Sequence, residues 1–254
     1  MPEEEEKKKK AGEITRREFL KDAGFVIVGA AIGASITYPL VPREEVVETI
    51  TETVEVTVEV KLPEPRHDSG VSIEETLLKR RSVRDYTGEC LNLQEVSQLL
   101  WAAQGTTDPR GFRTAPSAGA TYPLETYILV GDVEDLTEGV YRYIPAKHKL
   151  VKVLDGDWRA QLAGAALGQS SVKEGAVNIV FTAIYERTTQ RYGDRGIRYV
   201  HMEVGHAAQN VYLQAVALGL GTVVIGAFHD DQVQEILKLP QNEQPLYIMP
   251  VGRT

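Results

Sequence analysis

Two prolines, Pro63 and Pro65, divide the chain into two parts. The sequence before them lacks the hydrophobic pattern of a folded core, and the sequence after them has it. Before them, residues 44–60 alternate Val, Ile and Thr with Glu at a period near two, without a turn or partner strand beside them. We interpret residues 44–65 as an extended stalk or linker, or at best as an added edge strand. From Arg66 onward the composition becomes that of a globular domain. Residues 66–254 are about the length of one domain.

Residues 1–43 have the pattern of an export signal. Residues 3–10 are a block of Glu and Lys that will be solvated. Arg16 and Arg17 follow, and residues 23–41 then contain no charged side chain. Paired arginines before a Gly- and Ala-rich apolar run resemble a twin-arginine signal, which implies export of the folded protein across the cytoplasmic membrane. An amphipathic helix is the alternative, but residues 23–41 lack a polar face at helical spacing.

Cleavage of this segment and its retention as a membrane anchor are both compatible with the sequence. A run of about 19 apolar residues can span a bilayer, and Pro39 stands in it without a clean Ala-x-Ala site. Lys and Arg lie before the run, whereas Glu dominates after it. Because basic flanks stay in the cytoplasm, we expect the rest of the chain to lie outside.

Composition excludes several classes of function. The chain of 254 residues is 43% hydrophobic, carries a formal net charge of −8 and has one cysteine, Cys90. No Lys/Arg stripe interleaved with aromatics follows the first quarter, so we exclude nucleic-acid binding. One cysteine excludes an intrachain disulfide and a CxxC pair, and no His, Cys or carboxylate set has metal-ligand spacing. Redox chemistry would therefore need a cofactor.

The first informative motif is a helix with a basic exit, within residues 72–86. Ser72 and Glu75 form a capping box, and Ile73, Leu77 and Leu78 give the helix one apolar face. The exit carries four groups suited to a phosphate, which are Arg80, Arg81, Ser82 and Arg84. Arg offers forked donors, and Ser adds a neutral one. A solvated basic helix end, favoured by the helix dipole, is the equal alternative.

The second motif follows a predicted amphipathic helix over residues 93–104 that ends at Gly105. Residues 113–123 read RTAPSAGATYP. Their small side chains would let the backbone approach a flat ring closely and offer its N–H groups. The alternative is a surface turn before a strand over residues 124–130. The third motif, GLGTVVIGAF over residues 219–228, turns on glycines and leads through a short strand to Gly226.

These motifs, in this order, resemble the nitroreductase family over about residues 72–253, and the second resembles its SagB-type dehydrogenase branch. The resemblance implies an α+β fold with a central, mainly antiparallel sheet flanked by helices, in a homodimer that binds two FMN at its interface. It implies FMN phosphate and ribityl contacts from the basic exit and from Arg253, near the end of the terminal strand. It also implies that Pro116, Ser117, Ala118 and Gly119 lie against the flavin ring.

In the same family, the residue matching Gly226, which follows Ile225, offers its backbone N–H to flavin N5. Many members carry an acidic residue where this chain has Gly226 and Ala227, so substrate access is expected to differ. NADH or NADPH is the implied electron donor, although no GxGxxG motif supports it directly. The candidate substrate contacts are Tyr122, Arg195 and Tyr199. Arg195 and Tyr199 belong to an Arg- and Tyr-rich stretch, residues 187–199, that has no helical or strand regularity. Alternatively, this stretch is only the lead-in to the next helix.

The remaining pattern predicts further elements. Tyr141 and Tyr143 are expected to alternate along a strand, with His148 as an exposed turn residue. Residues 158–169 predict a helix, and residues 177–185 a buried strand. Residues 203–218 predict a long Ala-rich helix, and the family resemblance implies that it lies at the dimer interface. Its His206 is expected to be packed and hydrogen-bonded.

The function predicted is an FMN-dependent oxidoreductase that works in a ping-pong cycle on a small-molecule or peptide substrate. One alternative is a SagB-like dehydrogenase that oxidises a heterocycle or an amine in a peptide. The alternative outside the enzymes is a membrane-tethered module that binds flavin or another ligand without turnover.

Overall fold

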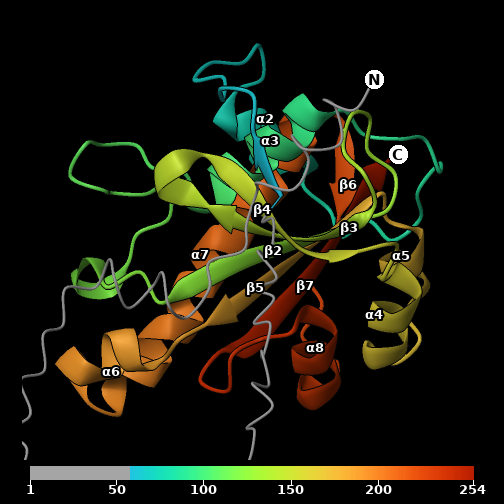
Figure 1. The fold of residues 1–254 in the computed structure, drawn as a ribbon. Helices are drawn as coiled ribbons and strands as arrows, with labels where there is room; N and C mark the ends of the chain where they lie inside the picture. Colours follow the sequence, from blue (N-terminus) through green and yellow to red (C-terminus); the bar gives the residue numbers. More distant parts are fainter. Residues whose placement is uncertain (1–57) are drawn as a thin grey trace, which may run out of the picture. The chain divides into compact units, whose positions relative to one another are not determined.

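The computed structural model describes residues 58–254, which form a seven-stranded sheet covered by helices on both faces (Figure 1). Its order is β1-β4-β3-β2-β5-β7-β6, and every neighbouring pair of these strands is antiparallel. The strands are β1 (Glu59–Lys61), β2 (Leu124–Val130), β3 (Gly139–Ile144), β4 (Lys149–Asp155), β5 (Val177–Ala183), β6 (Leu220–Thr222) and β7 (Gln244–Arg253). The α+β fold with a mainly antiparallel sheet is confirmed.

Seven α-helices surround this sheet in the described part of the chain. They are α2 (Ile73–Lys79), α3 (Leu93–Gln104), α4 (Arg159–Ala165), α5 (Ser170–Glu174), α6 (Glu186–Tyr192), α7 (Arg195–Ala217) and α8 (Asp230–Leu237). Two short 3-10 turns, η2 (Ala118–Ala120) and η3 (Pro145–Lys147), complete the elements. None of these helices has the combined length and apolar character needed to cross a membrane.

The sheet separates two apolar cores. One core joins the sheet to α3 and α7 through residues such as Leu99, Ile128 and Val211. The other joins its opposite face to α4, α5 and α8 through residues such as Leu162 and Val233. The alternation of side chains along each strand produces this division, since successive residues point to opposite faces. β2 and β5 are buried along their whole length, as expected for central strands.

Several local predictions agree with the structure. Helix α3 has the predicted bounds, and an Asn92–Glu95 capping box begins it. Strand β2 also has the predicted bounds. The Ser72 hydroxyl accepts the Glu75 N–H at the start of α2. Tyr141 and Tyr143 both lie on β3 and are buried.

Other predictions need correction. β1 is an edge strand that pairs with β4, which agrees with the edge-strand alternative for residues 44–65, and the folded unit therefore begins before the Arg66 boundary. The helix predicted over residues 158–169 ends at Ala165 because Leu167 and Gly168 have positive φ, and α5 follows as a separate helix. The stretch over residues 187–199 is helical, since it contains most of α6 and the first turn of α7. The predicted export signal lies outside the described residues.

Two histidines also differ from their predictions. His148 is half-buried, because its ring nitrogens bond to Tyr143, Ser97 and the Pro63 carbonyl at 2.8–3.0 Å. It ties the segment after β1 to β3 and α3. His206 is exposed on α7 in the single chain, so the packed role predicted for it is not present there.

Candidate functional site

The first and third sequence motifs meet at one side chain of α7, Tyr212. Its hydroxyl lies 3.1 Å from the Ser82 hydroxyl and accepts the Val224 N–H at 2.8 Å. The Arg80 guanidinium stacks over the same ring, 5.0 Å from its centroid. Tyr212 therefore fixes the basic exit of α2 beside the segment that leads to Gly226.

Arg80, Arg81 and Arg84 carry guanidinium groups that make no ion pair with a carboxylate in residues 58–254. The backbone between them is held rigidly, because the Val83 N–H donates to the Thr222 carbonyl at 2.9 Å. Beside them lies a hollow of about 190 Å³. It is lined in part by Lys79, Arg81, Thr222 and Thr254. Unpaired cations on a fixed backbone beside a hollow suit an anionic group such as a phosphate.

Hydrogen bonds to the sheet hold the residue before Gly226, whereas Gly226 itself is exposed. Ile225 and Ile248 exchange both backbone hydrogen bonds, at 2.8 and 2.9 Å. The next residue, Gly226, is exposed, and its N–H has no partner in the part of the chain that the structure describes. A rigid, unpaired main-chain donor results.

The second motif is a strained loop between α3 and β2. Gly119, Ala120 and Tyr122 all have positive φ, at 61°, 52° and 45°. The Ser117 hydroxyl accepts the Tyr122 N–H at 2.9 Å and so ties the two ends of the loop together. Asn210 of α7 donates to the Thr114 carbonyl at 3.3 Å just before it. Non-glycine residues with positive φ are costly and cluster at functional sites.

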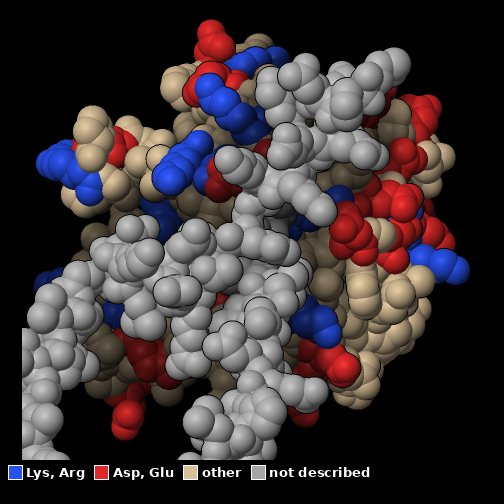
Figure 2. All heavy atoms as spheres, in the orientation of Figure 1, with Lys and Arg blue, Asp and Glu red and all other residues tan. Residues whose placement is uncertain are grey.

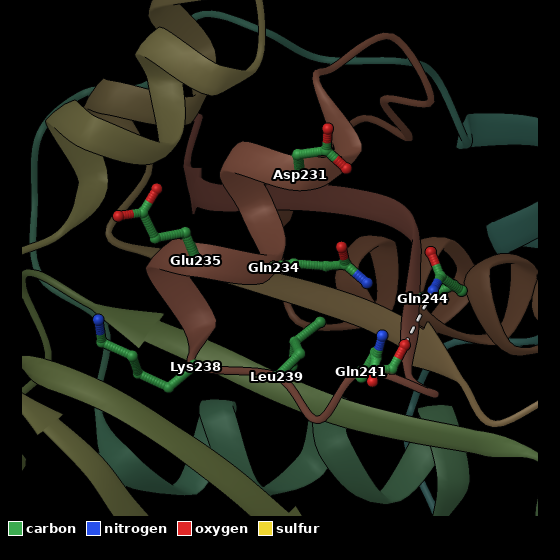
Figure 3. A pocket seen from close by; sticks show the side chains of 7 residues that line it. All are labelled: Asp231, Gln234, Glu235, Lys238, Leu239, Gln241 and Gln244. Atoms are coloured by element: carbon green, nitrogen blue, oxygen red, sulfur yellow. Dashed lines mark hydrogen bonds between the residues drawn. The ribbon is translucent and has the colours of Figure 1, made fainter.

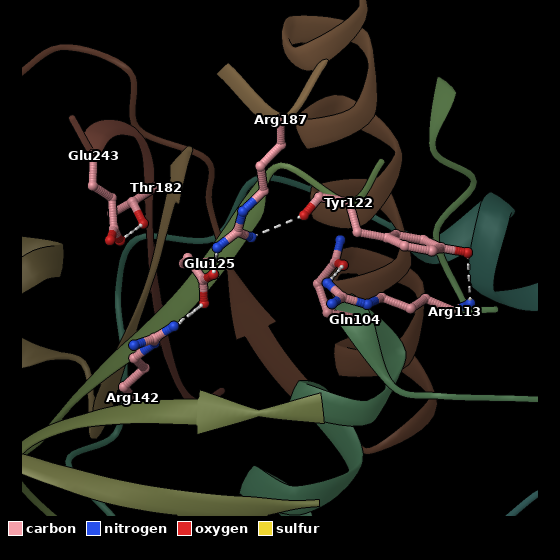
Figure 4. Close-up of polar contacts among 8 residues, drawn as sticks. All are labelled: Gln104, Arg113, Tyr122, Glu125, Arg142, Thr182, Arg187 and Glu243. Carbon is pink, nitrogen blue, oxygen red and sulfur yellow. Dashed lines mark hydrogen bonds and ion pairs between the residues drawn. The ribbon is translucent and has the colours of Figure 1, made fainter. Parts of the chain in front are cut away.

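Helix α6 holds this loop from outside, through contacts with three of its residues. Arg191 donates to the Gly119 carbonyl at 3.2 Å, and the Thr188 and Thr121 hydroxyls lie 2.7 Å apart. Arg187 donates to the Tyr122 carbonyl at 3.1 Å (Figure 4). The Arg- and Tyr-rich stretch thus positions the loop.

Comparison with known proteins identifies the family. The model of the nitroreductase family matches residues 77–253. The chain belongs to the nitroreductase family. It is 56% identical over 183 residues to a Methanocaldococcus jannaschii protein named as a nitroreductase, covering 72% of this chain and 91% of that one. A nitroreductase-named crystal structure from Ralstonia eutropha superposes with a TM-score of 0.69 and 31% identity, covering 77% of this chain and 89% of the other.

More distant relatives fall into two kinds. The FMN reductase (NADPH) of Bacillus subtilis is 26% identical over 192 residues, which cover 70% of this chain and 64% of that one. The microcin B17-processing protein McbC of Escherichia coli is 29% identical over 157 residues, which cover 59% of this chain and 58% of that one. The chain thus spans little more than half of the microcin relative. Membership makes this nitroreductase-family chain a flavin-dependent oxidoreductase.

The remaining candidate residues of this nitroreductase-family chain lie as follows. Tyr122 packs against Arg113. The Arg113 guanidinium stacks over the Tyr122 ring, 4.5 Å from its centroid, and the Tyr122 hydroxyl accepts the backbone N–H of Arg113. Arg195 stacks over Tyr199 at 5.9 Å, and Tyr199 meets Tyr192 edge-on. A side chain at Gly119 would lie 2.6 Å from the Tyr192 hydroxyl, so this aromatic pair reaches the loop.

Arg253 is already engaged in the single chain. Its guanidinium donates to the Cys90 carbonyl and to Glu95, both at 3.0 Å. A phosphate at this position would have to compete with the Glu95 carboxylate. The phosphate contact of Arg253 stays a prediction.

Sequence reasoning missed a polar network behind the loop, which Figure 4 shows. Glu125 of β2 pairs with Arg142 at 2.9 Å and with Arg187 at 2.6 Å. Thr182 bonds to the buried Glu243 beside this group. Burial raises the pKa of Glu243, and Thr182 opposes the shift. These residues come from separate parts of the chain, so no local sequence pattern indicated the network.

Glu203 of α7 was missed as well. It is 2% exposed, and burial raises its pKa to about 7 against the opposing effects of Ser117 and Arg113. A charged residue inside a predicted Ala-rich packing face was the signal that could have found it.

Two surface features lie away from these motifs. A polar hollow of about 650 Å³ runs along α8 and is lined by residues such as Asp231, Glu235 and Lys238 (Figure 3). No predicted site residue lines it. The face in Figure 2 carries acidic and basic side chains interspersed. No group of three or more metal-ligating side chains occurs between residues 58 and 254.

Proposed function

We propose that this chain binds FMN and catalyses electron transfer from NADH or NADPH to an acceptor in a ping-pong cycle. When bound, FMN supplies a ring nitrogen, N5, that accepts and returns a hydride. The chain's own part is placement and electrostatics. The observation that carries the proposal is the attachment of all three motifs to α7, through Tyr212 and Asn210.

The residues present fit FMN. Arg80, Arg81, Ser82 and Arg84 offer donors for its phosphate and ribityl chain, and the three guanidinium groups have no carboxylate partner within the described residues. The Pro116–Gly119 segment is at least partly exposed and has little side-chain bulk, so its backbone would be able to approach the ring. The free N–H of Gly226 would donate to N5 and stabilise the electron-rich ring without a side chain.

A second copy of the chain is part of the proposal. Ile73, Leu77 and Leu78 of α2 are 55%, 55% and 74% exposed, and Ile197 and Met202 of the adjoining α7 are also exposed. Apolar side chains gathered on two packed helices indicate an interaction surface. A homodimer through these helices would cover them. Leu78→Glu should then yield a monomer in light scattering, while the exposed Leu167→Glu should leave the dimer intact.

We propose export by the twin-arginine route, with the domain outside the cytoplasmic membrane and the signal either removed or kept as an anchor. Support comes from the pattern of residues 1–43 and from the need to insert FMN before export. Replacing Arg16 and Arg17 by Lys should retain the protein in the cytoplasm. Continued export through the general secretion channel would contradict this route.

The full-length chain tests the catalytic proposal. Its visible spectrum should show oxidised flavin bands, and mass analysis after denaturation should identify FMN. Stopped-flow mixing with NADH or NADPH should bleach these bands, and an acceptor should restore them. A flavin that stays oxidised with every donor would favour the non-catalytic binding module, and a colourless protein that takes up no FMN would remove both.

The microcin-processing relative supports a second candidate, a dehydrogenase that oxidises a heterocycle or an amine in a peptide. The loop sequence RTAPSAGATYP, like that of the SagB-type branch, favours it as well. Such a peptide should bleach the flavin without any nicotinamide, and molecular oxygen should then restore the colour. If NADH or NADPH bleaches the flavin and the peptide does not, the reductase function is supported instead.

A further inference from the structure

Glu203 is a buried carboxyl group for which the proposed cycle has no use. It lies on the core-facing side of α7 and is 2% exposed, and its Oε1 has no hydrogen-bond partner in the described part of the chain. A buried polar atom without a partner costs free energy, so its presence requires an explanation.

A second unpartnered group is related to Glu203 through Arg113. Gln104, at the end of α3, is fully buried, and its Nε2 also lacks a partner among residues 58–254. Its Oε1 accepts from the Arg113 guanidinium at 2.9 Å. Arg113 also bears electrostatically on Glu203. Arg113 thus bonds to a residue with an unsatisfied donor and acts electrostatically on a residue with an unsatisfied acceptor.

The groups around Glu203 connect it to the strained loop. Helix α7 packs against η2 of that loop, and Ser117, whose hydroxyl accepts the Tyr122 N–H, lowers the pKa of Glu203. Arg113 stacks on the Tyr122 ring. Ser117 and Arg113, the two groups that act on Glu203, therefore both contact Tyr122, at the end of the loop that, under the proposed function, faces the flavin.

Few other charged groups act on the carboxyl group of Glu203. Arg113 is the charged group that acts on it, whereas Glu125 of β2 and Arg187 of α6 act on Arg113. On α7, the titratable neighbours one turn away are Tyr199, which is half-buried, and His206, which is exposed. Burial raises the pKa of Glu203 to about 7, so its charge changes in the neutral range.

We propose that Glu203 is a positioning residue whose charge state sets the placement of Ser117 and Arg113 and thereby couples the flavin site to pH. The inference rests on the proposed function, because the loop faces a flavin only if FMN binds there. Ionised Glu203 accepts a charge-assisted hydrogen bond from the Ser117 hydroxyl and attracts the Arg113 guanidinium. Neutral Glu203 loses both effects.

The charge also acts on the redox equilibrium. A buried carboxylate opposes the accumulation of negative charge nearby, since Coulomb interactions are strong where water is excluded. Ionised Glu203 should therefore lower the midpoint potential of the bound flavin, and protonation should raise it.

The test compares the full-length chain with E203Q and with the matched control E243Q, which removes another buried carboxyl of raised pKa at a different place in the fold. The midpoint potential of the bound flavin is measured from pH 5.5 to 8.5. Wild type and E243Q should show a break near pH 7 that E203Q lacks. At pH 8.5 the potential of E203Q should be higher than that of wild type, and at pH 5.5 the two should agree.

Ser117→Ala provides a second variant if E203Q fails to fold. Because Ser117 lowers the pKa of Glu203, its removal should move the break to higher pH. An unmoved break in S117A, or a wild-type break in E203Q, would overturn the inference while FMN binding by the wild type still upheld the proposed function. A wild-type chain that binds no FMN would overturn both.

Discussion

Tyr212→Phe tests whether one hydroxyl joins two motifs of the site. The substitution keeps the ring, so the core packing of α7 and the stacking of Arg80 are preserved. It removes only the group that accepts the Val224 N–H and contacts Ser82. Any loss therefore reports the bridge between the basic exit of α2 and the segment ending at Gly226.

The magnitude follows from the burial of the partners. Tyr212 is 9% exposed and Val224 is half-buried, so the Val224 N–H would lose its acceptor where water reaches it poorly. An unsatisfied group of this kind costs about 1–3 kcal/mol, whereas exposed Ser82 can bond to water. We expect a loss of about 2 kcal/mol of unfolding free energy, or about 4–8 °C in Tm. FMN affinity should fall about tenfold, which is about 1.4 kcal/mol.

Urea unfolding without FMN measures the first effect, and a titration of flavin fluorescence measures the second. The matched control is Tyr143→Phe, which removes another buried tyrosine hydroxyl, the partner of His148, that makes no hydrogen bond to the three motifs. It should lose similar stability and keep its FMN affinity. Equal FMN affinity in the two variants would refute the idea that Tyr212 joins the motifs.

Three further predictions follow from buried or strained positions. The folded pKa of Glu203 is raised to about 7 from 4.5, so its folded state holds a proton that the unfolded state releases, and stability falls as pH rises between these values. Glu203→Gln should remove this loss and gain about 3 kcal/mol at pH 8.5 relative to pH 4.5 in urea unfolding. Glu125→Gln should cost about 2 kcal/mol by the same assay, because two half-exposed arginines lose their carboxylate. Gly119→Ala should cost about 1–2 kcal/mol and weaken FMN binding in a fluorescence titration, because its φ is 61° and the new methyl group would meet the Tyr192 hydroxyl. An unchanged midpoint for any of these variants would contradict the corresponding contact.

Elements with local start and stop signals were predictable from the sequence. Helix α3 matches to the residue because Asn92 and Glu95 cap its start and the chain leaves the helix at Gly105. β2 matches because most of its residues are apolar or β-branched and a turn precedes it. In both elements the determining interactions lie within a few residues of the chain.

The beginning of α7 was not predictable in the same way. The helix was predicted from residue 203, whereas α7 begins at Arg195. Gly196 is buried inside the helix, where an added side chain would lie 3.0 Å from the Thr189 backbone. Glycine is needed there so that α7 can approach α6 closely. Only the tertiary contact explains the residue, and local pattern does not contain it.

Exposure of apolar faces was also beyond local pattern. The periodicity of α2 predicted one apolar face from Ile73, Leu77 and Leu78, and these side chains are exposed in the single chain. A period shows which residues share a face, and it carries no information about what covers that face.

The candidate site shows the same limit in its most important form. Sequence motifs identified loops, because loops of Gly, Pro, Ser and Arg have distinctive composition. The relative placement of those loops depends instead on polar side chains of one helix, Tyr212, Asn210 and Glu203, set among alanines and valines. Each polar side chain in a packed helix face has a cost that an apolar residue would avoid. Its position therefore marks a contact that the core alone does not require, and in this chain those contacts lead to the motifs that identify the family.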